Sequence, residues 1–138
     1  MRRLVFLVLV IAMLATVTET TYAGVSWCPS FSIEGTELDV LLDTEEEIDP
    51  SATWVVVRVP RGVEANIVDS GGFRCKIVHR GRAEDDEIPV TVTVLVPRGA
   101  GRFDVRVTVE VPEYGILKSR DGTTGRPIKV KVKIPING

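Results

Sequence analysis

The stretch that indicates the fold most clearly is residues 103–111, which read FDVRVTVEV. Every odd-numbered position in it is apolar and every even-numbered position is polar. Because successive side chains of a β-strand point to opposite faces, this alternation predicts a strand with one buried face and one wet face. Residues 128–134, IKVKVKI, repeat the pattern with lysines at the polar positions. A row of lysines is typical of an edge strand.

Other segments on the N-terminal side of this stretch also predict strands. Residues 90–96 alternate in the same way, and residues 54–59, WVVVRV, are apolar almost throughout. The latter predict a central strand covered on both faces, with Trp54 in the core. Shorter strand patterns cover residues 31–33, 38–42 and 73–78. About seven short strands separated by Gly- and Pro-containing turns predict an all-β fold, an antiparallel two-sheet β-sandwich.

The N-terminus has the pattern of a secretory signal peptide. Arg2 and Arg3 precede an apolar run over residues 4–14, and the small residues around Ala23 predict cleavage between Ala23 and Gly24. The apolar run is shorter than the roughly 20 residues that a membrane-spanning helix needs. The sequence therefore predicts a signal over residues 1–23, a single domain over residues 24–138, and a secreted or cell-surface protein. An uncleaved signal acting as an anchor is the alternative, and the only predicted contact with a membrane.

The two cysteines, Cys28 and Cys75, both lie in the predicted mature part. An even number of cysteines in an exported domain predicts one disulfide. Two separate buried thiols are the alternative.

The composition bears on two questions, namely which classes of partner the protein binds and what kind of organism it comes from. The formal net charge of −2 comes from 17 basic and 19 acidic residues that are mixed along the chain. Such a balance does not favour a nucleic-acid partner or an anionic membrane. Glutamine is absent, and asparagine occurs only at Asn66 and Asn137. Few thermolabile amides together with many charged residues indicate a thermophilic source.

The spacing of the histidine and the cysteines does not fit a known type of catalytic or zinc site. The single histidine, His79, follows Cys75 by four residues, which on a strand places the two side chains about 13 Å apart. A cysteine nucleophile needs a base within hydrogen-bond reach, so this pair predicts no catalytic dyad. One histidine and two distant cysteines also give no zinc spacing. We predict neither an enzyme nor a cofactor.

Two acidic clusters are candidates for calcium ligands. Residues 43–49 contain Asp43 and Glu45, and residues 84–87 contain Asp85 and Asp86. Calcium takes six to eight oxygen ligands, which loops of sandwiches often supply. These four residues are the candidates for a calcium site shared between the two clusters. Neither cluster has the spacing of a dedicated calcium loop, so solvated charged loops are the other interpretation.

Cys28, Trp54 and Cys75 together give the chain a resemblance to immunoglobulin-like extracellular sandwich domains. In antibody-type domains the tryptophan follows the first cysteine by about a dozen residues, and here the interval is longer. The resemblance implies an architecture and no activity.

The predicted function is a non-enzymatic protein of the cell surface or extracellular matrix, with a structural, adhesive or assembly role. Its predicted partners are other surface or matrix proteins, or copies of itself. The segment Gly24–Ile33 is the candidate for a strand lent to a neighbouring copy, although Pro29 interrupts it. A secreted module that binds a glycan or calcium is the first alternative, and a secreted enzyme or enzyme inhibitor is the second.

Overall fold

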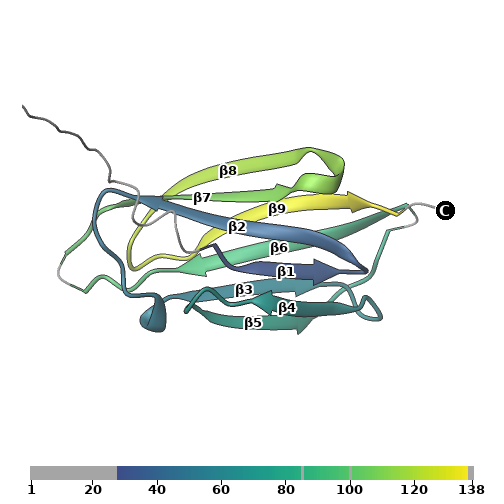
Figure 1. Cartoon of the computed structure of the whole chain (residues 1–138), viewed down its shortest axis with the longest axis horizontal. Coiled ribbons are helices and arrows are strands. Elements are labelled where there is room, and N and C mark those ends of the chain that lie inside the picture. The colour runs from purple at the N-terminus through teal and green to yellow at the C-terminus, as the bar shows by residue number, and fades with distance from the viewer. Residues whose placement is uncertain (1–27, 85, 100, 137–138) are drawn as a thin grey trace, which may run out of the picture.

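The computed structural model describes residues 28–84, 86–99 and 101–136. These residues form nine β-strands in two sheets, with two single-turn 3₁₀ helices, Pro50–Ala52 and Pro112–Tyr114 (Figure 1). The prediction of an all-β fold with two sheets is confirmed, and the predicted antiparallel pairing holds for every pair of neighbouring strands but one, which is parallel. The count of about seven strands is wrong, because two strands had no readable pattern.

The five-stranded sheet has the order β4-β1-β2-β7-β8. Its strands are β1 (Ser30–Ile33), β2 (Thr36–Thr44), β4 (Ala65–Asp69), β7 (Asp104–Val111) and β8 (Ile116–Thr123), and all of its neighbours pair antiparallel. The four-stranded sheet has the order β5-β3-β6-β9. Its strands are β3 (Trp54–Val59), β5 (Arg74–His79), β6 (Glu87–Leu95) and β9 (Ile128–Pro135). Here β3 and β5 pair in parallel and the other pairs are antiparallel.

The core lies between the two sheets and is built from the alternating positions. In β7, Val105, Val107, Val109 and Val111 are all buried, and the intervening polar residues point outward. The same alternation holds in β2, β6 and β9. Each inward side chain removes apolar surface from water, and this burial is the main favourable term in folding.

The missed strands, β4 and β8, are the two edges of the five-stranded sheet. Most of β4 is exposed, and β8 carries Lys118 and Arg120 at positions that a two-sided pattern would make apolar. Neither strand has a fully buried side chain, so burial does not impose on them the alternation seen in β9, which is also an edge strand.

The interpretation of β3 as a strand covered on both faces is wrong. Val55, Val57 and Val59 are buried, but Trp54 is 38% exposed and Arg58 is exposed. The reason is the two-layer architecture, which leaves the outer face of the four-stranded sheet in solvent. Trp54 therefore lies on the surface and not in the core.

A tight hairpin joins β1 to β2. Its two linking residues, Glu34 and Gly35, have φ values of 51° and 82°. Positive φ at both positions is the type I′ geometry that matches the twist of a two-residue hairpin. The hairpin places β1 between β2 and β4, with Phe31 and Ile33 fully buried.

Candidate functional site

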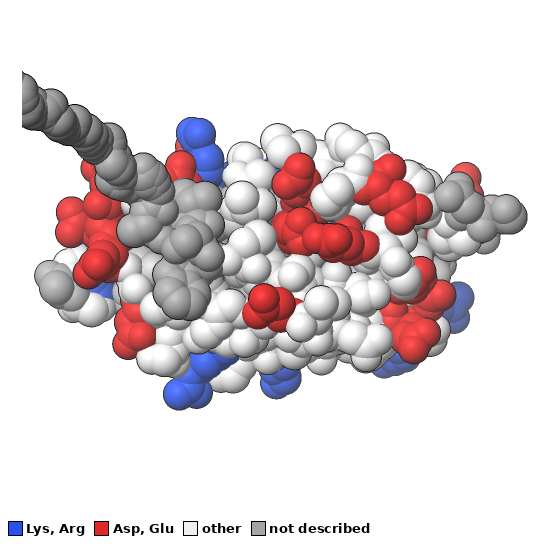
Figure 2. Space-filling view, in the orientation of Figure 1, with Lys and Arg blue, Asp and Glu red and all other residues white. Residues whose placement is uncertain are grey.

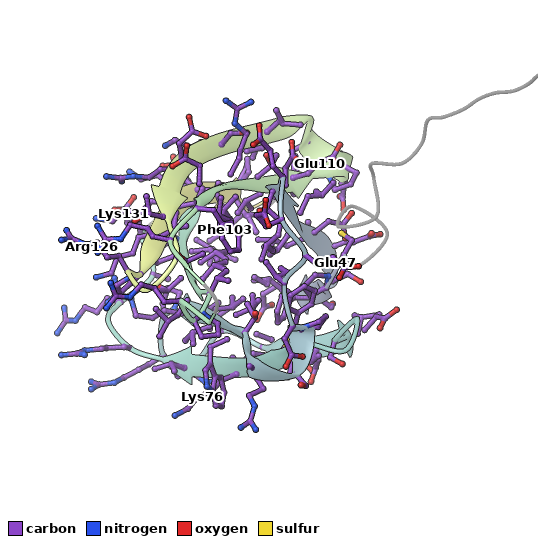
Figure 3. All side chains as sticks on the ribbon, turned by 90° about the vertical axis from the view of Figure 1, so that its left-hand side faces the viewer. Glu47, Lys76, Phe103, Glu110, Arg126 and Lys131 are labelled. Carbon is purple, nitrogen blue, oxygen red and sulfur yellow. The ribbon has the colours of Figure 1, made fainter. Side chains whose placement is uncertain are left out.

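The outer faces of the two sheets carry opposite charge. The basic face is the outward side of the four-stranded sheet, and its cations are Arg58, Arg74, Lys76, Lys129, Lys131 and Lys133. The acidic face is the outward side of the five-stranded sheet, and its carboxylates are Glu37, Asp39, Asp43, Asp104, Glu110 and Asp121. In Figure 3, Lys131 and Lys76 of the basic face point outward on one side of the molecule, and Glu110 of the acidic face lies on the other side.

The strand register determines which outward side chains of the basic face are neighbours. Lys129, Lys131 and Lys133 of β9 lie opposite Thr93, Thr91 and Pro89 of β6, respectively. Arg58 on the next strand, β3, lies opposite Thr91. The uncharged side chains Thr93, Thr91 and Pro89 of β6 therefore lie beside the lysine row of β9, with Arg58 of β3 on their other side.

An aromatic and apolar patch lies within the basic face. Trp54 is directly opposite Leu95, and these side chains are 38% and 36% exposed. The Arg74 guanidinium lies 5.6 Å from the centroid of the Trp54 ring, which is within the range of a cation–π contact. Tryptophan and arginine are enriched in protein interfaces, where their large flat groups bury area.

One end of the basic face is partly neutralised. The Lys133 ammonium lies 3.4 Å from a carboxylate oxygen of Glu84 and 3.9 Å from one of Glu87. These are exposed ion pairs, which contribute little to stability. Lys129 and Lys131 have no carboxylate partner within salt-bridge distance among the residues that the structure describes.

The acidic face brings like charges together. Asp39 of β2 lies directly opposite Glu110 of β7, and Glu37 is on the same side of β2. Partial burial, a hydrogen bond with the Glu37 side chain and the charges of Glu37 and Glu110 raise the pKa of Asp39 to about 6. Like charges directly opposite in an antiparallel pair are destabilising. Figure 2 shows acidic side chains across this face and basic ones mainly near its margins.

Arg106 is the exception on the acidic face. Its guanidinium Nε lies 2.8 Å from Asp121 Oδ1, and the hydrogen bond lowers the pKa of Asp121. Both groups are largely exposed, so the pair is a local surface contact.

The predicted disulfide is not present in the structure, in which Cys28 and Cys75 are free thiols. The Cys28 thiol lies close enough to Asp39 and Glu110 of the acidic face to interact with their charges. Cys75 instead packs against the hydrophobic core. The Ser70–Gly71 turn lies between them, with the Cys75 thiol 3.9 Å from the Ser70 carbonyl. The two sulfurs therefore face different surroundings despite their common neighbour.

Cys75 and His79 are not brought together as a nucleophile and base. The His79 Nε2 lies 2.8 Å from the Val63 carbonyl oxygen, and the Cys75 thiol is close to the Ser70 carbonyl. Burial, with the charge of Asp69, raises the pKa of Cys75 to about 11, which keeps the thiol protonated near neutral pH.

The described members of the two acidic clusters, which a shared calcium site would need side by side, lie at opposite ends of the sandwich. Asp43 lies at the end of β2, Glu45 follows it, and Asp86 precedes β6, at the opposite end of the sandwich (Figure 1). Asp85 lies outside the described residues. Asp43 and Glu45 instead line a surface hollow of about 720 Å³ together with Arg102 and Arg106. No group of three or more His, Cys, Asp or Glu side chains suited to a metal was found within the described ranges.

The candidate donor segment is only partly described. Its second half, Ser30–Ile33, is β1 of the molecule's own sheet, where it pairs with both β2 and β4. Donating it to another copy would require the tight hairpin to open and Phe31 and Ile33 to leave the core. Gly24 and the predicted cleavage site after Ala23 lie in residues 1–27, outside the described part.

Sequence reasoning missed Trp54, Leu95 and Arg74 as surface residues. The alternation of side chains along β3 identifies Trp54. Arg58 is charged and must contact solvent, and Trp54, four residues earlier on the same strand, points to the same face. The alternation over residues 90–96 already places Leu95 on the outward side with Thr91 and Thr93, but its position opposite Trp54, and that of Arg74 beside Trp54, follow only from strand pairing.

No family model, curated protein or solved structure matches this chain. Within the described residues, no helix has the length and apolar character needed to cross a bilayer.

Proposed function

We propose that this chain is an exported, non-enzymatic, immunoglobulin-like β-sandwich protein of the cell surface or extracellular matrix, and that its role is structural or assembly-forming. The observation that supports this most directly is the separation of charge onto two opposite sheet faces. Such faces are suited to contacts between macromolecules, because complementary potentials steer association and set its orientation.

The chemistry of the described side chains supports surface action over catalysis. The thiol of Cys75 is protonated near neutral pH, and the ring of His79 contacts a backbone carbonyl. Export is supported by the signal pattern over residues 1–23. The predicted partners remain other surface or matrix proteins and copies of the chain itself.

Light scattering coupled to size exclusion tests the proposed role. The gene is expressed with its own N-terminal segment, and the exported protein is run over a wide range of concentrations at low ionic strength. We expect species larger than the monomer whose proportion rises with concentration. A monomer at every concentration would overturn the assembly role.

A glycan-binding module is the second candidate, because Trp54 is a partly exposed aromatic ring on the basic face. An aromatic platform of this kind suits the apolar side of a sugar ring. Calorimetry of the monomeric protein with a panel of oligosaccharides distinguishes this function. Saturable heat that Trp54→Ala abolishes would favour glycan binding over assembly.

A further inference from the structure

We infer that the basic face of one copy docks on the acidic face of a second copy, so that molecules stack in one direction. This inference rests on the proposed assembly role and names its interface. Both surfaces belong to the same chain, and each presents the charge that the other lacks.

The basic face has the composition of a docking surface. Lys129 and Lys131 lack a carboxylate partner within salt-bridge distance in the described part of the chain. Trp54 and Leu95 supply exposed apolar area beside them. A mixture of an aromatic anchor and surrounding charge is typical of interface centres and rims.

The acidic face is left with unfavourable contacts in the isolated molecule. Asp39 and Glu110 are opposite each other, with Glu37 beside them, and the basic group on this face, Arg106, is engaged by Asp121. A row of cations brought against Asp39 and Glu110 would offset their repulsion. The free monomer therefore favours a cationic partner at this surface.

The geometry of the two faces determines the form of assembly. A two-fold dimer brings the same patch of both copies together, which here would oppose like charges. Docking of unlike faces is heterologous, and it leaves one basic and one acidic face unused at the two ends. Since the faces lie on opposite sides of the sandwich, each added copy restores both free faces (Figure 3).

Two double variants test the interface. The first, Lys129→Glu with Lys131→Glu, alters the basic face, and the second, Glu37→Lys with Asp39→Lys, alters the acidic face. These side chains point outward, so the core is unchanged. A matched control, Arg82→Glu with Lys118→Glu, reverses two exposed cations that lie outside both faces.

Sedimentation at low ionic strength gives the readout. We expect each double variant alone to lose self-association by roughly tenfold or more, and the control to associate like the parent. An equimolar mixture of the two variants should regain association, because the first retains its acidic face and the second its basic face. Circular dichroism of each variant confirms that it remains folded.

The outcomes separate this inference from the proposed function. If the parent assembles and both double variants assemble equally well, the face-to-face interface is wrong while the assembly role stands. If the parent remains monomeric, both fail. A monomeric parent that binds heparin, with binding lost in Lys129→Glu with Lys131→Glu, would assign the basic face to a polyanion and overturn docking of a second copy.

Discussion

At the scale of single residues, the outer faces are shaped by charges that the fold forces together. Asp39 and Glu110 are separated by many residues in the chain, but antiparallel pairing of β2 and β7 makes them direct neighbours. Glu37 adds to the same cluster because alternate residues of a strand share a face. Partial burial, together with the hydrogen bond to Glu37 and these neighbouring charges, raises the pKa of the Asp39 carboxyl group to about 6.

Asp39 is therefore expected to make stability depend on pH. Its pKa is about 6 in the folded state against an ordinary 3.8, so between these pH values the folded state holds a proton that the unfolded state has lost. The contribution of Asp39 to stability must then fall as pH rises through this window. We expect Asp39→Asn to be more stable than the parent at pH 7 and similar to it near pH 4, measured by urea unfolding.

Asp43→Asn is the matched control, because Asp43 lies opposite Arg106 on the same pair of strands. Removal of this carboxylate should give no stabilisation at pH 7. A parent and an Asp39→Asn variant that differ equally at pH 4 and pH 7 would contradict the assignment to Asp39.

The two cysteines give a second residue-scale prediction. Partial burial is the main cause that raises the pKa of both thiols to about 11. Because the thiolate is the reacting species, iodoacetamide at pH 8 should modify the reduced folded protein roughly tenfold to a hundredfold more slowly than an unfolded chain. Modification at the same rate before and after unfolding would contradict this expectation.

At the scale of elements, strands that bury one face follow from the local pattern, and strands that bury few side chains do not. Residues 103–111 and 128–134 were correctly predicted as β7 and β9, because burial of one face imposes the alternation that can be read. The strands β4 and β8 are not predicted, since neither has a buried side chain and burial therefore imposes no alternation on them. The candidate site is harder still: Trp54 meets Leu95 and Arg74 only through the order of strands in the sheet.

The hairpin between β1 and β2 supplies a prediction at this scale. Gly35 has a φ of 82°, a conformation that L-residues with a side chain rarely adopt, although the space around it is open. We expect Gly35→Ala to destabilise the fold by about 1 kcal/mol through backbone strain alone. Gly101→Ala, at a glycine without positive φ and also in open space, is the control and should change the unfolding midpoint little.

At the scale of the whole molecule, the uneven distribution of charge matters more than its total. The formal net charge is only −2, a balance that predicts neither a nucleic-acid partner nor an anionic membrane. Strand pairing sorts the same residues onto two sides, so that an almost neutral chain presents one basic and one acidic face. The net charge is informative about solubility, but it does not show this separation because the charges of the two faces cancel in the sum.

Processing of the N-terminus is a prediction for the whole chain. The apolar run over residues 4–14 and the small residues up to Ala23 predict that the exported protein begins at Gly24. Intact-mass analysis of protein from the medium or cell surface should give the mass of residues 24–138. Recovery of the uncut chain in the membrane fraction would instead show that the segment is an anchor.

Ionic strength supplies the last prediction, because stacking through charged faces must respond to it. The Debye length falls from about 30 Å at 0.01 M salt to about 3 Å at 1 M, so exposed charges on facing sheets are screened as salt is added. We expect the assembled fraction of the parent protein to fall steeply over this range in sedimentation experiments at constant protein concentration. Assembly driven instead by the apolar patch of Trp54 and Leu95 would persist or strengthen when sodium sulfate is the added salt, since that salt favours apolar burial. Running sodium chloride and sodium sulfate in parallel therefore separates the two contributions, and assembly that is indifferent to both would contradict docking through the charged faces.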